Sequence, residues 1–192
     1  MLSGVTISRA SLHNADFIRD KGILLKDSVR IQRSGEVIPY VVAPVINART
    51  GSEIEIVIPV TCPVCHTEVV RSKTDIHIYC PNATCPAQIK GKIAYRVSRD
   101  AMNIDGVGDS IIELLVDQGL VKNVADLYTL EQPQKRIQMM AMPLIGQRKF
   151  QLITDELKKS KNNALRRVIN GLGIQHIGKK TAQIIVEAIT AS

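Results

Sequence analysis

Aromatic side chains are scarce in this sequence of 192 residues, which has no tryptophan, two phenylalanines and four tyrosines. Proteins that bind single-stranded nucleic acid usually stack the bases on aromatic side chains, so the shortage disfavours that mode of binding. Any core must be built from Ile, Val and Leu instead. With 45% hydrophobic and 22% charged residues, the composition is still that of a globular protein, and the length allows one to three small domains.

Long apolar runs are also lacking, and none approaches the roughly 20 residues that a membrane-spanning helix needs. The N-terminus shows no charged segment followed by an apolar stretch, which is the pattern of a secretory signal. We therefore expect no membrane partner. We expect a cytosolic protein, in a compartment that keeps thiols reduced.

The charge is basic and unevenly distributed. The formal net charge is +7 and the pI is about 9.4. Residues 101–126 hold five acidic side chains and one basic one, whereas residues 127–192 hold eleven basic and four acidic ones. A basic balance suits an anionic partner such as nucleic acid, although a solvated basic surface would give the same net charge.

The first third of the chain has the alternation of β-strands. Residues 28–33 and 53–58 alternate apolar and polar side chains, which predicts strands with one face on a core. Residues 40–46 are apolar and interrupted by Pro44, which predicts an edge strand or a bend. Short strands with polar connections fit a small barrel, so we assign residues 1–60 to a β-barrel.

From about residue 88 the apolar residues recur with helical spacing, and we assign residues 88–192 to an all-α domain. The predicted apolar faces are Ile111, Leu114 and Leu115; Phe150, Ile153 and Leu157; Leu165, Val168, Ile169 and Leu172; and Ile185 and Ile189. Gly119 and Gly171 lie where the C-caps of two of these helices are expected. The predicted fold class is therefore multidomain α+β.

All four cysteines lie in the segment 61–87, as Cys62-Pro-Val-Cys65 and Cys80-Pro-Asn-Ala-Thr-Cys85. Two pairs of thiolates on tight turns supply the four tetrahedral ligands of a structural zinc ion. Buried thiols or disulfides are the alternative, and the paired spacing in a cytosolic chain disfavours both. His66 and His77 are interpreted as ordinary polar residues rather than spare ligands. So short a segment buries little apolar surface, so the metal would supply most of its folding energy.

Three segments of the helical region share one pattern, namely residues 104–112, 143–150 and 174–182. Each has a short turn that ends in a glycine, Gly108, Gly146 or Gly178, followed by an amphipathic helix. An earlier glycine of the pattern is present only as Gly106, while Leu144 and His176 stand at the matching positions.

Such a turn exposes backbone N–H groups at a helix N-terminus, where the helix dipole favours an anion such as phosphate. Arg148, Lys149, Lys179 and Lys180 follow two of the turns and add positive charge. Ordinary helix connections also contain glycine, but three turns in register predict sequence-independent binding to duplex backbone. The first turn is flanked by Asp105 and Asp109, so it either binds through N–H groups alone or only packs the domain.

The order of barrel, cysteine module and glycine turns resembles the NAD-dependent DNA ligases of bacteria. The stretches that resemble signatures of this family are Gly4–Asn14 (GVTISRASLHN), Arg33–Pro39 (RSGEVIP), Cys62–Cys65 (CPVC), Val97–Gly108 (VSRDAMNIDGVG), Gly119–Leu127 (GLVKNVADL) and Leu172–Gly178 (LGIQHIG). Together they run through nearly the whole chain.

The resemblance implies a role for each part. Residues 1–60 would be the oligonucleotide-binding (OB) barrel that grips the minor groove at a nick, with Arg33, Val37 and Ile38 against the DNA. Residues 61–87 would be the four-cysteine zinc finger, and residues 88–192 the helix–hairpin–helix domain. The implied DNA-binding residues of that domain are Gly106, Gly108, Gly146, Arg148, Lys149, Gly173, Gly178, Lys179 and Lys180. The whole enzyme would seal nicks in duplex DNA during replication and repair.

The sequence also departs from the family. The Lys-x-Asp-Gly motif, whose lysine takes AMP from NAD, does not occur, so we predict no catalytic residue here. The first barrel strand, the fourth hairpin and the BRCT domain are expected outside this sequence. Leu144 leaves open whether the second hairpin contacts DNA. We therefore expect a monomeric fragment that binds nicked double-stranded DNA and a structural zinc ion. NAD and magnesium would be used only by the complete enzyme, which includes an adenylation domain. The resemblance also implies a bacterial cytoplasmic protein associated with the nucleoid.

Two other readings compete with a ligase fragment. One is a stand-alone, non-enzymatic zinc-containing module that binds DNA. The other is a helix–hairpin–helix DNA glycosylase, because Ile177–Ala182 (IGKKTA) resembles the hairpin of those enzymes, with Lys180 near the position of their attacking lysine. Those enzymes need an aspartate downstream, and only Glu187 follows in this chain.

Overall fold

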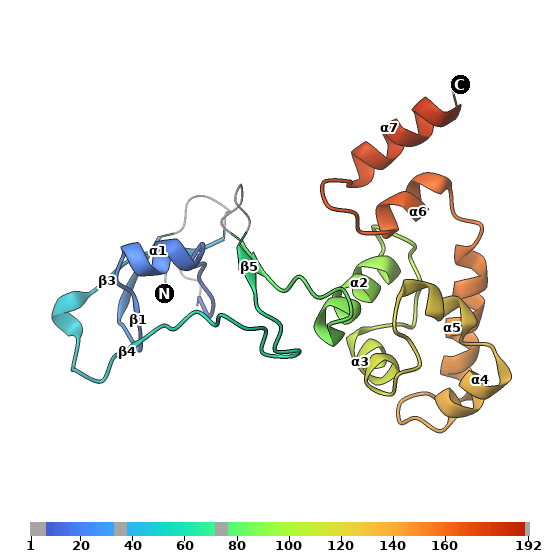
Figure 1. The fold of residues 1–192 in the computed structure, drawn as a ribbon, viewed down its shortest axis with the longest axis horizontal. Helices are drawn as coiled ribbons and strands as arrows, with labels where there is room; N and C mark the ends of the chain where they lie inside the picture. The colour runs from blue at the N-terminus through green and yellow to red at the C-terminus, as the bar shows by residue number, and fades with distance from the viewer. Residues whose placement is uncertain (1–6, 33–37, 72–76, 191–192) are drawn as a thin grey trace. The chain divides into compact units, whose positions relative to one another are not determined.

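The computed structural model describes residues 7–32, 38–71 and 77–190. The chain divides into two compact units, Met1–Pro81 and Asn82–Ser192. The first carries the strands and the second carries most of the helices (Figure 1). Of the helices in these described ranges, none combines the length and the apolar character needed to cross a membrane.

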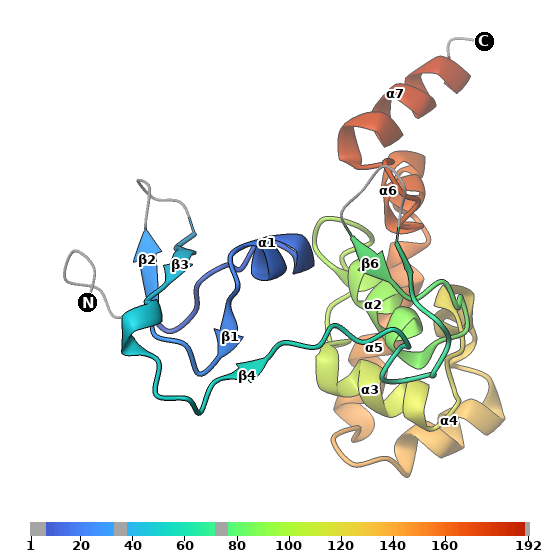
Figure 2. The same ribbon diagram turned by 60° about the vertical axis from the view of Figure 1, so that its left-hand side comes forward.

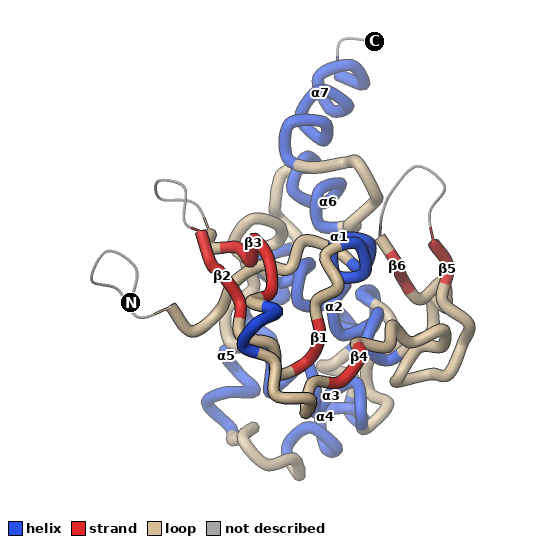
Figure 3. The backbone as a smooth tube through the Cα atoms, turned by 90° about the vertical axis from the view of Figure 1, so that its left-hand side faces the viewer, coloured by secondary structure: helices blue, strands red, loops and turns tan. Residues whose placement is uncertain are grey.

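The first unit contains short antiparallel strand pairs, drawn red in Figure 3. Its elements are α1 (Ala15–Asp20), β1 (Leu24–Leu25), β2 (Val29–Gln32), β3 (Tyr40–Pro44), the 3-10 helix η1 (Ile46–Ala48), β4 (Ile54–Glu55), β5 (Val70–Arg71) and β6 (Ile78–Tyr79). The pairs are β1 with β4, β2 with β3, and β5 with β6. Among the described residues these ladders stay separate rather than closing into a barrel.

The strands predicted over residues 28–33 and 40–46 are confirmed as β2 and β3. They pair antiparallel, with an irregularity between Arg30 and Ile31. Pro44 is the last residue of β3, as its missing N–H requires. On the other side of β3, the Val41 N–H donates to the Ser11 carbonyl at 2.9 Å, which forms a short parallel bridge at Tyr40.

The strand predicted over residues 53–58 is largely wrong, because only Ile54 and Glu55 are in a strand. Its partner β1 is two residues long, since Lys26 takes a positive φ of 71° and turns the chain away. A two-stranded ladder can be no longer than its shorter strand, so the residues after Glu55 have no strand partner in this ladder. On the predicted apolar face, Ile54 is 53% exposed and Ile58 is 37% exposed. The alternating pattern therefore does not mark a face on a core.

An ion pair fastens the turn after β1 to the segment after η1. Asp27 accepts hydrogen bonds from Nε and Nη2 of Arg49, both at 2.8 Å, and from the N–H of Leu24 at 2.7 Å. Arg49 also donates to the carbonyl of Gly22 at 2.7 Å. The Asp27 side chain is only 1% exposed. The hydrogen bonds from Arg49 hold the pKa of Asp27 below its ordinary value, because they favour the charged carboxylate.

The second unit is a helical domain with one continuous core. Its elements are α2 (Pro86–Val97), α3 (Asp109–Asp117), η2 (Val124–Thr129), α4 (Pro133–Met140), α5 (Gln147–Ser160), α6 (Leu165–Gly171) and α7 (Lys179–Thr190). The core residues with almost no exposure include Ile93, Leu115, Leu127, Leu130, Met139, Ile145 and Ile153. On α5 the predicted face of Phe150, Ile153 and Leu157 is buried, which confirms it. On α3 Ile111 and Leu115 are buried and Leu114 is half-buried, so that face is confirmed for two of its three residues.

The predicted apolar faces of α6 and α7 are confirmed only in part, because Val168 is half-buried and packs against the core, and Ile169 and Ile185 are half-buried. The buried residues of α6 are Asn170 and Gly171, while Leu165 and Leu172 are about half exposed at 49% and 50%. In α7 the buried residue is Ala182, and Ile189 is 60% exposed. Helix α6 therefore packs through polar and small residues as well as through Val168.

The reason lies on α2, which offers polar groups to α6. The Tyr95 hydroxyl donates to Oδ1 of Asn170 at 2.9 Å, and Nη1 of Arg96 donates to the Val168 carbonyl at 3.1 Å. A Cβ atom on Gly171 would lie 3.1 Å from Nη1 of Arg96. Gly171 is therefore a close-approach residue, and its predicted role as a C-cap is wrong.

In the second unit, the glycines that follow helices with a positive φ are Gly119 and Gly173. Gly119, after α3, has a φ of 69°, which agrees with its predicted C-cap role. Gly173, after α6, has a φ of 64°. The glycine expected to end α6 at residue 171 is thus found two residues later.

The Asp27–Arg49 pair predicts how the stability of the first unit depends on pH. Because the folded-state pKa of Asp27 is lowered, its contribution is complete above the unfolded value of about 3.9 and is lost as the pH falls through the folded value. We expect Asp27→Asn to lower the Tm at neutral pH and this difference from wild type to shrink below about pH 4.

Thermal unfolding followed by circular dichroism between about pH 7 and pH 3 would measure this. Asp20→Asn is the matched control, since Asp20 is an exposed partner of Arg19. A Tm difference for Asp27→Asn that stays constant over the acidic range would contradict the prediction.

Candidate metal centre and nucleic-acid interface

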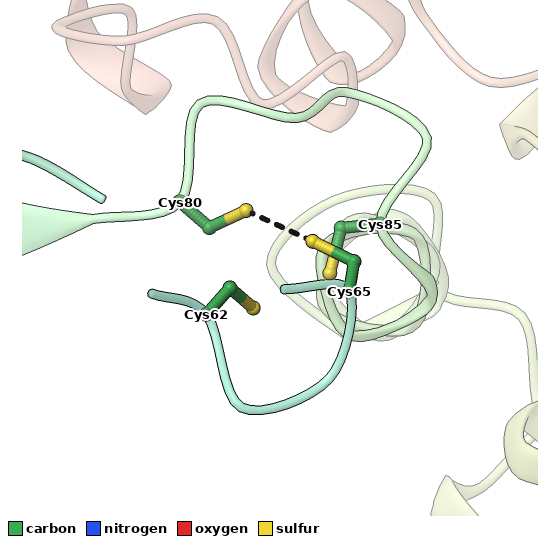
Figure 4. Close-up of side chains that lie close together, drawn as sticks. All are labelled: Cys62, Cys65, Cys80 and Cys85. Atoms are coloured by element: carbon green, nitrogen blue, oxygen red, sulfur yellow. Dashed lines mark hydrogen bonds between the residues drawn. The ribbon is translucent and has the colours of Figure 1, made fainter. Parts of the chain in front are cut away.

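The four cysteine sulfurs converge on one point, as Figure 4 shows. All four lie within 4.8 Å of one another, and the sulfurs of Cys65 and Cys80 are 3.5 Å apart. Zinc–sulfur bonds of about 2.3 Å at tetrahedral angles place ligand sulfurs about 3.8 Å apart, so the cluster has the size of a zinc site. A disulfide needs about 2.05 Å, which the Cys65–Cys80 separation excludes for that pair.

Local backbone hydrogen bonds position the first pair. The N–H of Cys62 donates to the Thr67 carbonyl at 2.8 Å, and the N–H of His66 donates to the Cys62 carbonyl at 2.9 Å. His66 takes a positive φ of 57°, which closes the turn. The chain therefore folds back just after Cys65, so that both sulfurs face the same point.

The second pair is positioned by an asparagine turn and a helix start. Oδ1 of Asn82 accepts hydrogen bonds from the N–H and the hydroxyl of Thr84, at 2.9 and 2.7 Å. The N–H of Cys85 donates to the Asn82 carbonyl at 3.1 Å. Cys85 is the N-cap residue of α2 and Pro86 its first residue, a position that proline favours.

The cysteine segment has little apolar burial of its own. Among its described residues, the buried ones are the ligand candidates Cys62 and Cys85. Val64 is 50% exposed and Tyr79 is 49% exposed. A metal ion would therefore supply the cohesion that apolar packing does not.

The donor set fits zinc in a structural role. The converging ligand atoms in the described ranges are the four sulfurs, and His66 and His77 are not among them. Four thiolates fill the tetrahedral positions of zinc and leave none open for a water or a substrate.

The three glycine turns of the second unit share one backbone geometry. Gly106, Leu144 and His176 stand at the matching position and all take a positive φ, of 88°, 69° and 66°. Two residues later, Gly108 and Gly146 have nearly the same angles, with φ and ψ of −85° and 177° and of −86° and 176°. The turn is thus kept where the glycine is replaced, although a left-handed non-glycine residue costs about 1–2 kcal/mol.

The glycine that ends each turn begins a helix. The carbonyls of Gly108, Gly146 and Gly178 accept hydrogen bonds from the N–H groups four residues ahead, at 3.0, 2.9 and 2.9 Å. The apolar residue before the glycine holds two turns in the core, since Val107 is 4% exposed and Ile145 is 2% exposed.

The backbone around these three glycines is accessible. Each of them is exposed, and a Cβ atom added to any of the three would meet no described atom within 4 Å. A large anion can therefore approach the N–H groups at these helix starts.

The predicted DNA-binding residues differ in accessibility. Arg148 and Lys180 are exposed and Lys149 is half-buried. Lys179 is exposed but lies 2.5 Å from a carboxylate oxygen of Asp100. Ile38 is 71% exposed.

Two predicted residues, Arg33 and Val37, lie outside the described residues. Gly173 contacts the ring of Tyr95, with 3.5 Å to the position of an added Cβ atom, so its surroundings are those of a packing residue.

Sequence reasoning missed further basic residues near Lys179. Arg99, Lys159, Arg166 and Arg167 line two neighbouring pockets of the second unit. The excess of basic residues after position 126 was the signal for them, but charge counts do not show which side chains lie together.

Comparison with known proteins identifies two segments. Residues 1–53 match the family model of the NAD-dependent DNA ligase OB-fold domain, and residues 61–87 match that of the NAD-dependent DNA ligase C4 zinc finger domain. The predicted OB-fold and zinc finger are thereby supported, and the resemblance to NAD-dependent DNA ligases is confirmed.

Curated relatives cover nearly the whole chain and are named DNA ligase. The protein of Carboxydothermus hydrogenoformans is 45% identical over 182 residues, which is 95% of this chain and 27% of the relative. Those of Clostridioides difficile and Bacillus subtilis are 43% and 42% identical over 184 residues, each 96% of this chain and 27% of the relative. The chain thus spans about a quarter of the length of these relatives.

The cluster geometry predicts one bound zinc ion. We expect metal analysis of the purified protein to give about one zinc per chain. Cys80→Ser removes one thiolate, so it should lower both the zinc content and the Tm. His66→Asn is the control, because His66 lies in the same loop but outside the cluster, and asparagine tolerates its positive φ. Zinc-free wild-type protein with the melting curve of the zinc-containing protein would refute the metal site.

Proposed function

We propose that this chain, which carries the OB-fold and zinc finger domains of an NAD-dependent DNA ligase, is the part of such an enzyme that grips nicked duplex DNA. The observation that carries the proposal is the repeated turn geometry of the helical unit, together with the two domain matches. Three exposed helix starts, each preceded by a residue with positive φ, offer backbone N–H groups to phosphates.

Each segment has a part in the proposal. Residues 1–60 form the OB domain, residues 61–87 the zinc finger, and residues 88–192 the helix–hairpin–helix domain. The zinc ion has a structural role, which follows from its closed set of four thiolates. The DNA contacts come from backbone N–H groups and from Arg148, Lys149 and Lys180, so binding is independent of base sequence.

The second turn is included in this interface. Leu144 stands where a glycine was expected, yet its φ of 69° keeps the turn, and the following Gly146 is exposed. The replacement therefore leaves the N–H groups at the start of α5 in place. The side chain of Leu144 is 68% exposed and adds an apolar surface at the tip of the turn.

The proposed contribution to nick sealing is positioning. The Lys-x-Asp-Gly sequence is absent from these 192 residues, and the thiolates are arranged for a metal rather than for nucleophilic attack. Holding the two DNA ends in line accelerates a reaction by making it effectively unimolecular. NAD and magnesium would then be used by another part of the complete enzyme, the adenylation domain. The complete enzyme would seal nicks during replication and repair.

A stand-alone DNA-binding module is the second candidate, and it differs in one measurable respect. A ligase segment should support sealing when a separately made adenylation domain is added, whereas an independent module should not. Fluorescence anisotropy with a nicked duplex tests the binding that both share. Each phosphate contact should contribute about −0.9 to the slope of log affinity against log salt concentration.

The turn glycines predict a ranking of DNA affinity. Gly178→Val places a branched side chain over the start of α7, next to Lys180, and should weaken duplex binding about tenfold, the value of one charge-assisted hydrogen bond. Gly108→Val makes the same change at the start of α3, where Asp105 and Asp109 already repel phosphate, and should weaken binding less.

The two variants are matched, because neither glycine has a positive φ and both have open space around an added Cβ atom. Gly106 is unsuitable for this test, since its φ is 88° and a Cβ atom would lie 3.1 Å from Leu152. The reverse ranking, or a strong preference for one base sequence, would count against the proposed interface.

The missing nucleophile predicts that this chain alone forms no covalent adduct with AMP. Incubation with labelled NAD, magnesium and nicked DNA, followed by a denaturing gel, should show no labelled band at the mass of this chain. Adding an adenylation domain that extends through the first strand of the OB domain should restore some sealing. A labelled band from this chain alone would show that one of its lysines is an activated nucleophile.

A further inference from the structure

Two basic pockets adjoin each other in the helical unit and share Arg167. One, of about 220 Å³, is lined by Asp100, Arg166, Arg167, Asn170, Lys179 and Gln183. The other, of about 400 Å³, includes Arg99, Lys159 and Arg167 in its lining. The smaller pocket brings together α6, the start of α7 and the loop after α2. Figure 2 shows α6 and α7 in the upper part of this unit.

Side chains from α6 and the residues before it hold the loop after α2. Nδ2 of Asn163 donates to the Met102 carbonyl at 2.7 Å, and Nδ2 of Asn170 donates to the Asp100 carbonyl at 2.9 Å. Nη2 of Arg167 donates to the Arg99 carbonyl at 2.7 Å. Three carbonyls of one short loop are thus fixed, and the wall of the smaller pocket is built before any ligand arrives.

A carboxylate already lies among the cations of the smaller pocket. Nζ of Lys179 is 2.5 Å from Oδ1 of Asp100, and the two side chains are 62% and 71% exposed. The hydrogen bond from Lys179 lowers the pKa of Asp100, and the charges of Lys179 and Arg167 act in the same direction. The carboxylate of Asp100 therefore marks the position at which Lys179 binds an anion in this pocket.

We propose that the smaller pocket is a phosphate site for the backbone of duplex DNA, whose place is held by Asp100 in the free protein. Lys179 exchanges the Asp100 carboxylate for a phosphodiester oxygen, while Arg166 supplies a second cation. The proposal rests on the proposed function, because it assumes that duplex DNA binds this unit. It adds Arg166 as a contact and makes Asp100 a built-in competitor that limits the affinity.

A phosphate oxygen can replace the Asp100 carboxylate at these cations. Carboxylate and phosphate oxygens accept the same charge-assisted hydrogen bonds from lysine and arginine. An exposed ion pair contributes little to stability, so displacing Asp100 from Lys179 costs the complex at most a few-fold in affinity. The displaced carboxylate remains near the phosphate and repels it, and this repulsion is what an amide at position 100 would remove.

Affinity for a nicked duplex, measured by anisotropy over a series of salt concentrations, tests the site. Asp100→Asn should tighten binding about two- to fivefold and steepen the salt slope by up to about 0.9, because Lys179 is released for a phosphate. Arg166→Gln should weaken binding and make the slope shallower by about 0.9.

Each variant has a control with the same change of charge in the same unit. Asp117→Asn removes a carboxylate from another ion pair, in which Asp117 lies 2.8 Å from Lys90. Lys92→Gln removes an exposed cation on α2 that lines neither pocket. Thermal unfolding of all four variants checks that the fold is kept, since the residues changed are at least partly exposed.

The outcomes separate this site from the proposed function. If Asp100→Asn gains no more affinity than Asp117→Asn, or Arg166→Gln loses no more than Lys92→Gln, the phosphate site is refuted. The wild-type protein would then still bind duplex DNA and still respond to Gly178→Val. If the wild-type protein does not bind duplex DNA at all, the proposed function fails and the phosphate site fails with it.

Discussion

The convergence of four thiolates is the constraint on which the middle of this chain depends. The segment 61–87 contains apolar residues, yet Val64, Val70, Ile78 and Tyr79 are at least one-third exposed, so hydrophobic burial contributes little to its fold. The backbone turns at His66 and Asn82 bring the sulfurs together, but such turns alone do not offset the entropy of ordering a chain. Metal–thiolate bonds do, and one of the ligand candidates, Cys85, is also the N-cap of α2. The helix on which Ile93 and Val97 join the core thus begins at the metal site.

The sequence predicted those features whose cause is local. Ligand spacing is local, so the cysteine cluster could be predicted as a set of four. The faces of α3 and α5 could be predicted because their neighbours are apolar, and periodicity then marks the buried side. The face of α6 could be predicted only in part, because its partner α2 presents Tyr95 and Arg96, whose hydrogen bonds to Asn170 and to the Val168 carbonyl add to the apolar packing of Val168. The length of β4 could not be predicted either, because it depends on its partner β1, which ends where Lys26 takes a positive φ and turns the chain.

The glycine turns show the difference between a residue pattern and the conformation that it encodes. Glycine at the first position is the usual means of reaching a positive φ, and only Gly106 supplies it. Leu144 and His176 reach the same region without glycine, and for Leu144 the turn is fixed from both sides. In the second turn, Ile145 is buried and the helix that follows Gly146 packs Phe150 and Ile153 into the core. Strain of this size persists only when the surroundings determine the backbone, which packing of this kind provides. A motif search that requires both glycines would therefore miss two of the three turns.

In the proposed interface, the distribution of charge would give the helical unit a means of limiting its affinity for DNA. A surface with only basic residues near Lys179 would bind duplex backbone more tightly, and each added contact would steepen the dependence on salt. Asp100 lies at that point, with its carboxylate 2.5 Å from Lys179, and Lys179 and Arg167 lower its pKa. If the proposed interface binds DNA, a carboxylate that pairs with the lysine again when the phosphate departs would favour release. In that proposal the exposed helix starts position the DNA, while the balance of Asp100 against its neighbouring cations limits how tightly the DNA is bound.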